Sequence, residues 1–171
     1  MKTNRILTVA ALAAVVTLTF NAFAQGKPSW AAAAKPGSST IVEIVLQPDG
    51  EFDVLQAAVV RAGLVDALNG KDQYTVFAPT DAAFVATLGV ANEAEAIAVV
   101  NALPLDALTN ILLYHVTEGR HTSRSVLAAP EYEMLNGQYL TRDELLGAGI
   151  ALKDISASNG IIHVINHVLI P

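Results

Sequence analysis

The sequence predicts an α+β domain, because helical patterns gather in its first part and strand patterns gather in its second. Asn136-Gly137, set between short apolar or aromatic runs, predicts a two-residue hairpin turn. Runs of β-branched residues over 150–155 and 161–170 predict two further strands. This arrangement favours α+β over a parallel sheet in which strands and helices alternate.

Residues 1–24 predict a secretory signal peptide that is cleaved near Ala24. Lys2 and Arg5 give a positive start, and an Ala-Phe-Ala tripeptide supplies the small-x-small cleavage pattern. The apolar stretch between them is about 15 residues long, whereas a membrane-spanning helix needs roughly 20. No cysteine stands near the cleavage point to take a lipid anchor. We expect secretion to the periplasm or outside the cell, without stable membrane insertion after cleavage.

The remaining chain predicts one domain behind a short lead-in. Residues 25–39 are rich in Ala, Pro, Gly and Ser and predict a flexible segment, so the domain spans residues 40–171. Once Lys2 and Arg5 leave with the signal, sixteen acidic residues face eight basic ones, a formal charge of about −8. That charge argues against a nucleic-acid partner or an anionic membrane. The absence of cysteine excludes thiolate catalysis and Cys-ligated metals.

Several segments of the first part carry the start and stop signals of short helices. Thr40 and Glu43 have capping-box spacing, and a helix predicted to begin at Phe52 is ended by Gly63. Apolar residues at helical spacing predict further helices over 81–88, 92–100 and 104–115.

The most informative segment is YTVFAPTDAAF, from Tyr74 to Phe84. A β-type run breaks at Pro79, and Thr80 or Asp81 can cap the helix that follows. The segment predicts a strand that turns directly into a helix.

The second informative segment is SNGIIHVINHVLIP, from Ser158 to Pro171. Asn159-Gly160 marks a turn, and a β-branched run then carries His163 toward the last residue. Together with Tyr114-His115 between them, the two segments resemble the signature segments of the fasciclin domain family. The resemblance covers about residues 40–171.

The resemblance implies a β-wedge of two small sheets flanked by several short helices. It implies structural roles for the motif residues Phe77, Pro79, Thr80, Asp81, Phe84, Asn159, Gly160 and His163. It also makes Tyr114 and His115 a candidate adhesion surface. The alternative for His115 is a partly buried imidazole whose ring nitrogens bind backbone groups of the next strand. Asp81 departs from the family, which commonly has Asn there, although either residue caps a helix.

Three other features bear on possible binding sites. Asp154-Ile155 matches an Asp-Ile pair that some animal relatives present to integrins, whereas the alternative is a solvated or turn-capping aspartate. His163 and His167 stand four residues apart, and on a strand this separation is about 13 Å, too far for one shared zinc ion. No metal site is therefore predicted. Arg120, His121 and Arg124 form a basic cluster that either meets an acidic partner or is a solvated loop.

No nucleophile elbow, phosphate-binding glycine loop or catalytic spacing occurs, so neither an enzyme nor a cofactor is predicted. The sequence favours a secreted module that recognises a cell-surface or matrix protein or glycan. The alternative is a carrier of a small apolar ligand such as a carotenoid or lipid, a property of some relatives. Neither the partner nor the oligomeric state follows from the residues.

Overall fold

The computed structural model describes residues 37–47 and 50–171. The predicted signal peptide and most of the predicted lead-in lie outside the described residues. At the end of the lead-in, the Gly37 N–H donates to the Ser156 carbonyl, and the Ser158 N–H donates to the Ser39 carbonyl. The chain therefore enters the domain alongside the turn that joins its last two strands.

The elements follow the α+β order. The described helices are α2 (Ile41–Val45), α3 (Asp53–Arg61), α4 (Val65–Leu68), α5 (Asp81–Leu88), α6 (Glu93–Ala102), α7 (Leu105–Leu113), α8 (Ser123–Val126) and α9 (Arg142–Ala148). The described strands are β1 (Tyr74–Pro79), β2 (Val116–Glu118), β3 (Glu131–Glu133), β4 (Tyr139–Thr141), β5 (Ile150–Ala157) and β6 (Gly160–Ile165). Two small sheets with flanking helices confirm the predicted fold class.

Side chains at the predicted positions start the helices. Thr40 and Glu43 form a capping box at α2, and Thr80 and Asn92 each accept an N3 amide hydrogen bond at α5 and α6. A second capping box, formed by Thr141 and Glu144, starts α9. We did not predict this helix, although the Thr-x-x-Glu spacing is visible in the sequence.

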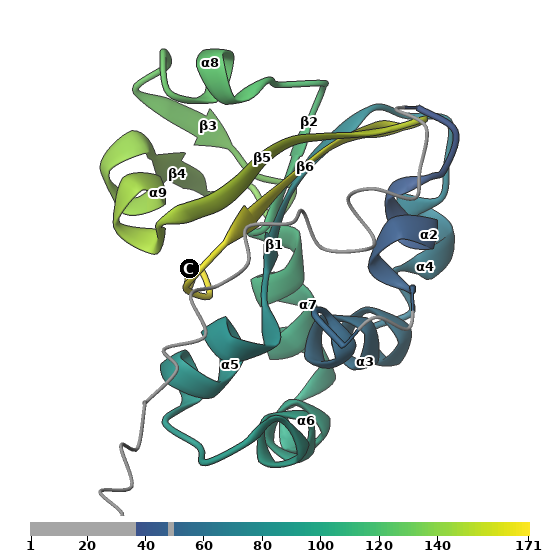
Figure 1. Cartoon of the computed structure of the whole chain (residues 1–171), viewed down its shortest axis with the longest axis vertical. Helices are drawn as coiled ribbons and strands as arrows, with labels where there is room; N and C mark the ends of the chain where they lie inside the picture. Colours follow the sequence, from purple (N-terminus) through teal and green to yellow (C-terminus); the bar gives the residue numbers. More distant parts are fainter. Residues whose placement is uncertain (1–36, 48–49) are drawn as a thin grey trace, which may run out of the picture.

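β1 and β6 form the centre of the larger sheet, whose strand order is β2-β1-β6-β5. They run parallel, in register from Tyr74 opposite Gly160 to Pro79 opposite Ile165, whereas the other two pairs are antiparallel. Figure 1 shows the two strands side by side through the middle of the molecule. The two signature segments therefore become neighbouring strands.

The alternation of side chains along these strands divides the core in two. Val76 and Val164 pack into a larger cluster with the side chains of α2, α3, α6 and α7. Phe77 and Ile165, on the opposite face, pack into a smaller cluster with Tyr114, Val126, Met134, Leu140, Leu145, Ala148 and Leu169. The small sheet and α9 cover this second face (Figure 1).

The hairpin between β3 and β4 differs from the predicted two-residue turn. Gly137 has φ 81°, but Asn136 is not among the residues with positive φ, which a two-residue type I′ turn requires at both positions. Instead the Met134 N–H donates to the Gln138 carbonyl and the Gly137 N–H to the Met134 carbonyl. These bonds enclose a three-residue turn in which glycine takes the left-handed position.

Two predicted boundaries were too long. β6 ends at Ile165, and the chain then leaves the sheet, where the Val168 N–H bonds the Thr87 hydroxyl and the Leu169 N–H bonds the His115 ring. The helix predicted to reach His115 ends at Leu113, with Tyr114 as its C-cap. In both places the regular element ends before the apolar pattern does.

Among the described residues, no single helix is long and apolar enough to cross a bilayer. The pair α5 and α6 reaches that length and composition together, with a bend of 69° between them.

We predict that Gly160→Ala lowers the free energy of unfolding by about 3 kcal/mol, because strand backbones cannot shift cheaply in a packed core. A Cβ at this position would lie 2.0 Å from the Tyr74 carbonyl oxygen and 2.7 Å from Ile41. Urea unfolding measures the change. The matched control is Gly147→Ala in α9, where a Cβ meets nothing within 4 Å, and where alanine adds up to about 1 kcal/mol of helix propensity. Equal stability of the two variants would contradict the close approach of β1 and β6.

Candidate functional site

His115 lies in the core and bonds backbone on two sides. The Leu169 N–H donates to its Nε2 over 2.9 Å, so the ring proton is on Nδ1, which donates to the Ile111 carbonyl over 2.8 Å. The residue is 3% exposed. Burial lowers the pKa of His115 to about 4, and the bond to Ile111 offsets only part of that shift. The ring is neutral at pH 7 and joins the end of α7 to the C-terminal segment.

Tyr114 packs on the opposite side, in the smaller core cluster. It is 4% exposed, and its hydroxyl donates to the Tyr139 carbonyl over 3.3 Å. Burial, with a smaller contribution from the Glu144 charge, raises the pKa of Tyr114. Neither ring of the Tyr114-His115 pair lies on the surface of the folded domain. The adhesion role predicted for this pair stays a prediction.

The strand-to-helix unit places Asp81 where it caps a second helix. Thr80 caps α5, while the Asp81 carboxylate accepts from the Asp53 and Val54 N–H groups over 3.0 Å and 2.9 Å. α3 has no capping bond from its own N-cap residue, Phe52, so Asp81 replaces it. Two carboxylate oxygens suit two amide donors, which is a physical reason for Asp at this position.

Three carboxylates meet at this joint. One oxygen from each of Asp53, Asp81 and Glu93 lies within 4.8 Å of the others. Burial first, then the charges of Asp81 and Asp53, raises the pKa of Glu93. Carboxylate oxygens are ligands for hard cations, so these three residues are those that could hold one. The spacing of 53, 81 and 93 follows no sequence pattern, and the cluster was not predicted.

Asn159 ties three segments together at the start of β6. Its Oδ1 accepts from the Ile41 N–H over 2.8 Å, and its Nδ2 donates to the Leu68 and Gly70 carbonyls. The side chain is buried, so these bonds satisfy polar groups that water does not reach. Gly160, next to it, allows the backbone of β1 to approach.

His163 and Asp154 form a second polar joint, on the face that also holds Phe77. The Asp154 N–H donates to His163 Nδ1 over 3.3 Å, so Nε2 carries the proton and donates to the His121 carbonyl over 2.9 Å. The ring stacks on Phe77, with centroids 5.7 Å apart, and is fully buried. Both nitrogens of this imidazole therefore bond backbone groups.

The Asp154 carboxylate is engaged within the molecule. Its oxygens accept from the Ser123 N–H over 2.7 Å and from the Ser123 hydroxyl over 2.6 Å, at the start of α8. Asp154 has φ 58° at an irregular part of β5, and Ile155 is half-buried opposite Ile162. Asp154 and Ser123 lie near His163 but do not form a catalytic triad with it. Both ring nitrogens of His163 bond backbone groups, so neither can accept the serine proton.

The predicted basic cluster is also anchored. Arg120 donates to the Ala157 carbonyl over 2.9 Å and to the Ser156 hydroxyl, and the His121 N–H donates to the Thr75 hydroxyl. Arg124 is exposed on α8. Arg120 thus fastens the loop before α8 to the end of β5.

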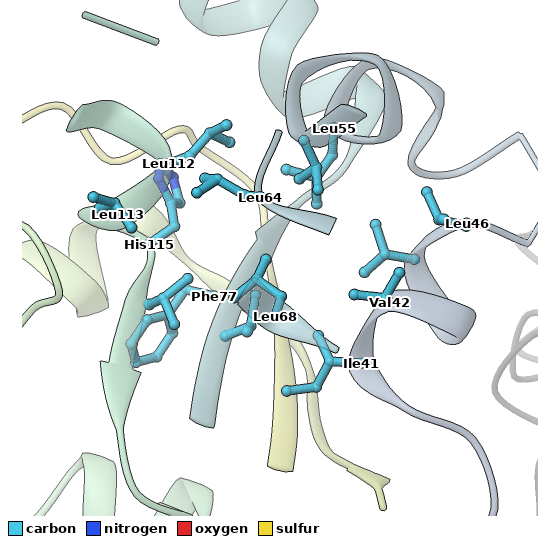
Figure 2. Close-up of a pocket in the computed structure, with 14 residues that line it drawn as sticks. Ile41, Val42, Leu46, Leu55, Leu64, Leu68, Phe77, Leu112, Leu113 and His115 are labelled. Carbon is cyan, nitrogen blue, oxygen red and sulfur yellow. The ribbon is translucent and has the colours of Figure 1, made fainter. Parts of the chain in front are cut away.

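The apolar spaces inside the described part are small. One cavity of about 30 Å³ lies between α2, α3, α7 and β1, and Figure 2 shows aliphatic side chains, Phe77 and His115 around it. Another, of about 90 Å³, lies between α5, α7 and the C-terminal segment. Both are smaller than the roughly 150 Å³ cavity that admits benzene in an engineered protein.

Two open grooves are larger. One, of about 280 Å³, runs between α9 and residues 167–170 with Tyr114 at its floor. The other, of about 380 Å³, separates β2 from the hairpin and is lined by Thr117, Glu118, Glu133, Met134, Leu135 and Gly137. No pattern in the sequence indicated this second groove, because β2 has three residues and no periodicity of its own.

The chain belongs to the fasciclin domain family, whose model matches residues 50–171. It is 38% identical over 147 residues to protein sll1483 of Synechocystis sp., which covers 81% of this chain and 77% of that protein. It is 35% identical over 116 residues to the cell surface glycolipoprotein MPB83 of Mycobacterium bovis, covering 63% of this chain and 48% of that protein.

The fold is similar to that of a solved FAS1 domain pair from the insect cell adhesion molecule fasciclin I. The TM-score is 0.56 and the identity 17%, over 78% of this chain and 51% of that one. This likeness supports the fold, and together with the family match it confirms the resemblance drawn from the signature segments.

We predict that His115 makes the domain less stable in acid. The pKa of His115 is about 4 when folded, against roughly 6.5 when unfolded, so the unfolded state takes the proton first as pH falls. Its contribution is complete above pH 6.5 and is lost toward pH 4, about 2–3 kcal/mol between pH 7 and 4.5. Urea unfolding at pH 7 and pH 4.5 measures how much unfolding free energy the protein loses in acid. This loss should be smaller in His115→Leu than in the parent protein by about 2–3 kcal/mol. His167→Leu, at an exposed histidine, is the control, and an unchanged difference in His115→Leu would contradict a buried neutral ring.

We also predict that Asp81→Asn lowers the pKa of Glu93, because one of the two neighbouring charges that raise it is removed. The side-chain carboxyl signal of Glu93, followed by NMR against pH, measures this. Glu43→Gln, at a distant capping box, should leave the Glu93 titration unchanged. A Glu93 pKa that stays the same in Asp81→Asn would show that the three carboxylates do not interact.

Proposed function

We propose that this protein is a secreted, non-enzymatic recognition module that binds cell-surface or extracellular-matrix components. The observation that carries the proposal is membership of the fasciclin domain family, together with similarity to a mycobacterial cell surface glycolipoprotein. The cell adhesion molecule from insects shares the fold. The predicted signal peptide supports a location outside the cytoplasm.

The use of the polar signature residues supports recognition rather than catalysis. His115 and His163 bond backbone groups through both ring nitrogens, and the side chains of Asn159 and Asp81 also bond backbone groups within the domain. An acid, base or nucleophile needs a free atom within reach of a substrate. These residues instead hold the helices and strands of the domain together, so we assign recognition to the exposed surface.

The segment that follows Tyr114 supplies exposed surface. β2 lies at an edge of the larger sheet, Glu118 is exposed at its end, and Tyr139 is 55% exposed on the neighbouring hairpin. Adhesion here is a property of this exposed segment, which the buried Tyr114 and His115 rings hold in place. One such module binds weakly, and many copies on one surface add avidity.

The small apolar cavities weigh against the alternative of a carrier. A carotenoid or lipid needs far more room than cavities of about 30 and 90 Å³ provide. Loading such a ligand would require α2 or the C-terminal segment to move away from the core. Protein isolated from its host would then show a visible absorption band or extractable lipid.

The test is binding of the exported protein to whole cells, matrix proteins and a glycan array. We predict saturable binding to at least one of these surfaces, lost on heat denaturation. Absence of binding to every surface, or catalytic turnover of a compound by the purified protein, would contradict the proposal.

A further inference from the structure

The groove between β2 and the β3–β4 hairpin lies between two strand edges. On either side of β2, the Phe77 N–H bonds the His115 carbonyl and the Gly119 N–H bonds the Gln73 carbonyl. The odd-numbered residues from 115 to 119 therefore turn their backbone N–H and C=O groups toward β1. In an antiparallel pair the intervening residues turn their backbone groups to the other side. Val116 and Glu118 therefore direct their N–H and C=O groups to the outer edge of the sheet. The Glu118 carbonyl already accepts a bond from the His121 ring over 2.9 Å, so the Glu118 N–H is the group of this residue that can bond a partner.

β3 presents its own free edge toward the same space. The Met134 N–H bonds the Gln138 carbonyl and the Arg142 N–H bonds the Pro130 carbonyl, so the even-numbered residues pair with β4. By the same alternation, Glu131 and Glu133 turn their backbone groups away from β4. The Glu133 carbonyl faces β2, since it accepts a bond from the Thr117 hydroxyl over 2.7 Å.

The two edges are joined at one end and separate toward the other. The Leu135 N–H donates to the Val116 carbonyl over 2.8 Å, yet β2 and β3 belong to different sheets. Beyond this bond lies the groove of about 380 Å³. Gly137 adds no side chain to its wall, and buried Thr117 and Met134 form its floor.

Its charged walls are acidic. Glu118 on one side and Glu133 on the other are exposed, and the residues that line the groove include no base. The Glu118 charge, together with that of Asp72, also contributes to the raised pKa of Tyr74, after burial. A groove with these walls favours a cationic partner.

We propose that this groove binds an extended, basic peptide segment of a partner protein by strand addition to β2. The Glu118 N–H donates to a backbone carbonyl of the peptide, and alternate Lys or Arg side chains meet the Glu118 and Glu133 carboxylates. Strand addition obtains affinity from main-chain bonds and specificity from alternate side chains. The inference rests on the proposed recognition function, for which it names the chemistry of the partner.

The test is an NMR titration of the exported ¹⁵N-labelled protein with the peptide acetyl-KVKVKVK-amide. We expect backbone amide shifts confined to residues 116–119 and 131–137, with binding that weakens as salt is raised. Acetyl-EVEVEVE-amide has the same strand propensity and opposite charge, and it should leave these amides unshifted. Spermidine, a cation without a peptide backbone, should not reproduce the shift of the Glu118 amide.

Three variants separate charge from backbone pairing. Glu118→Gln and Glu133→Gln should each weaken the lysine peptide about two- to fivefold, as loss of an exposed ion pair does. Glu118→Pro also removes the outward N–H and should weaken binding beyond Glu118→Gln, at an edge position where proline is tolerated. The control is Asp66→Asn, an exposed acid on α4, which should bind like the parent protein. If the proline variant does not fold, the affinity of the double variant Glu118→Gln/Glu133→Gln for the lysine peptide tests the inference instead.

Shifts scattered over other faces, equal binding of both peptides, or no loss of affinity in the double variant would overturn the inference. Failure of the peptide titration while the protein still binds cells or matrix saturably would reject the groove alone. Failure of both experiments would reject the proposed function as well.

Discussion

β1 and β6 come from distant parts of the chain and run parallel at the centre of the domain, and the rest of the structure depends on this pairing. Their side chains are buried apart from that of Tyr74, which is half-buried, and they supply both core clusters. The pairing requires Gly160, because any side chain there would meet the β1 backbone. A parallel pair between distant segments also closes a long loop, so we expect it to form late and cooperatively in folding.

Buried polar side chains extend this centre into the surrounding elements. Asn159 reaches the start of α2, 118 residues away in sequence, and His115 reaches the C-terminal segment, 54 residues away. Asp81 caps α3 across 28 residues. Such groups are costly to bury without partners, so each bond fixes where its helix or strand lies. The signature residues thus build a rigid framework, while the outer edge of β2, with exposed Glu118, and the hairpin lie at the surface.

The sequence was sufficient for the elements whose signals are local. Thr40, Thr80 and Asn92 mark helix starts through bonds to residues three positions ahead, and the break at Pro79 marks the end of β1. The Asn136-Gly137 pair located the hairpin but not its turn type, because the choice depends on the φ of Asn136. β6 was predicted too long because apolar residues continue beyond Ile165, where Val168 and Leu169 pack against the core clusters rather than pair in the sheet.

The candidate site was harder to predict from the sequence than the fold, because the chemistry of a polar side chain depends on partners that are distant in the chain. The alternative of a buried His115 with both ring nitrogens on backbone groups matches the geometry. The partners were predicted in the next strand, and this part was wrong, because one partner lies in its own helix and the other in the C-terminal segment. Nothing near Glu118 or Glu133 indicates a groove, since it arises from the way the two sheets separate.

Native-state hydrogen exchange of the β1 and β6 amides tests the central pairing most directly. If the two strands form one cooperative unit, the amides of Val76, Ala78, Ile162 and Val164 should exchange only through global unfolding, with one common free energy that equals the value from urea unfolding. Opening of β6 at a lower free energy than β1 would contradict the account, because the two signature segments would then not form a single scaffold.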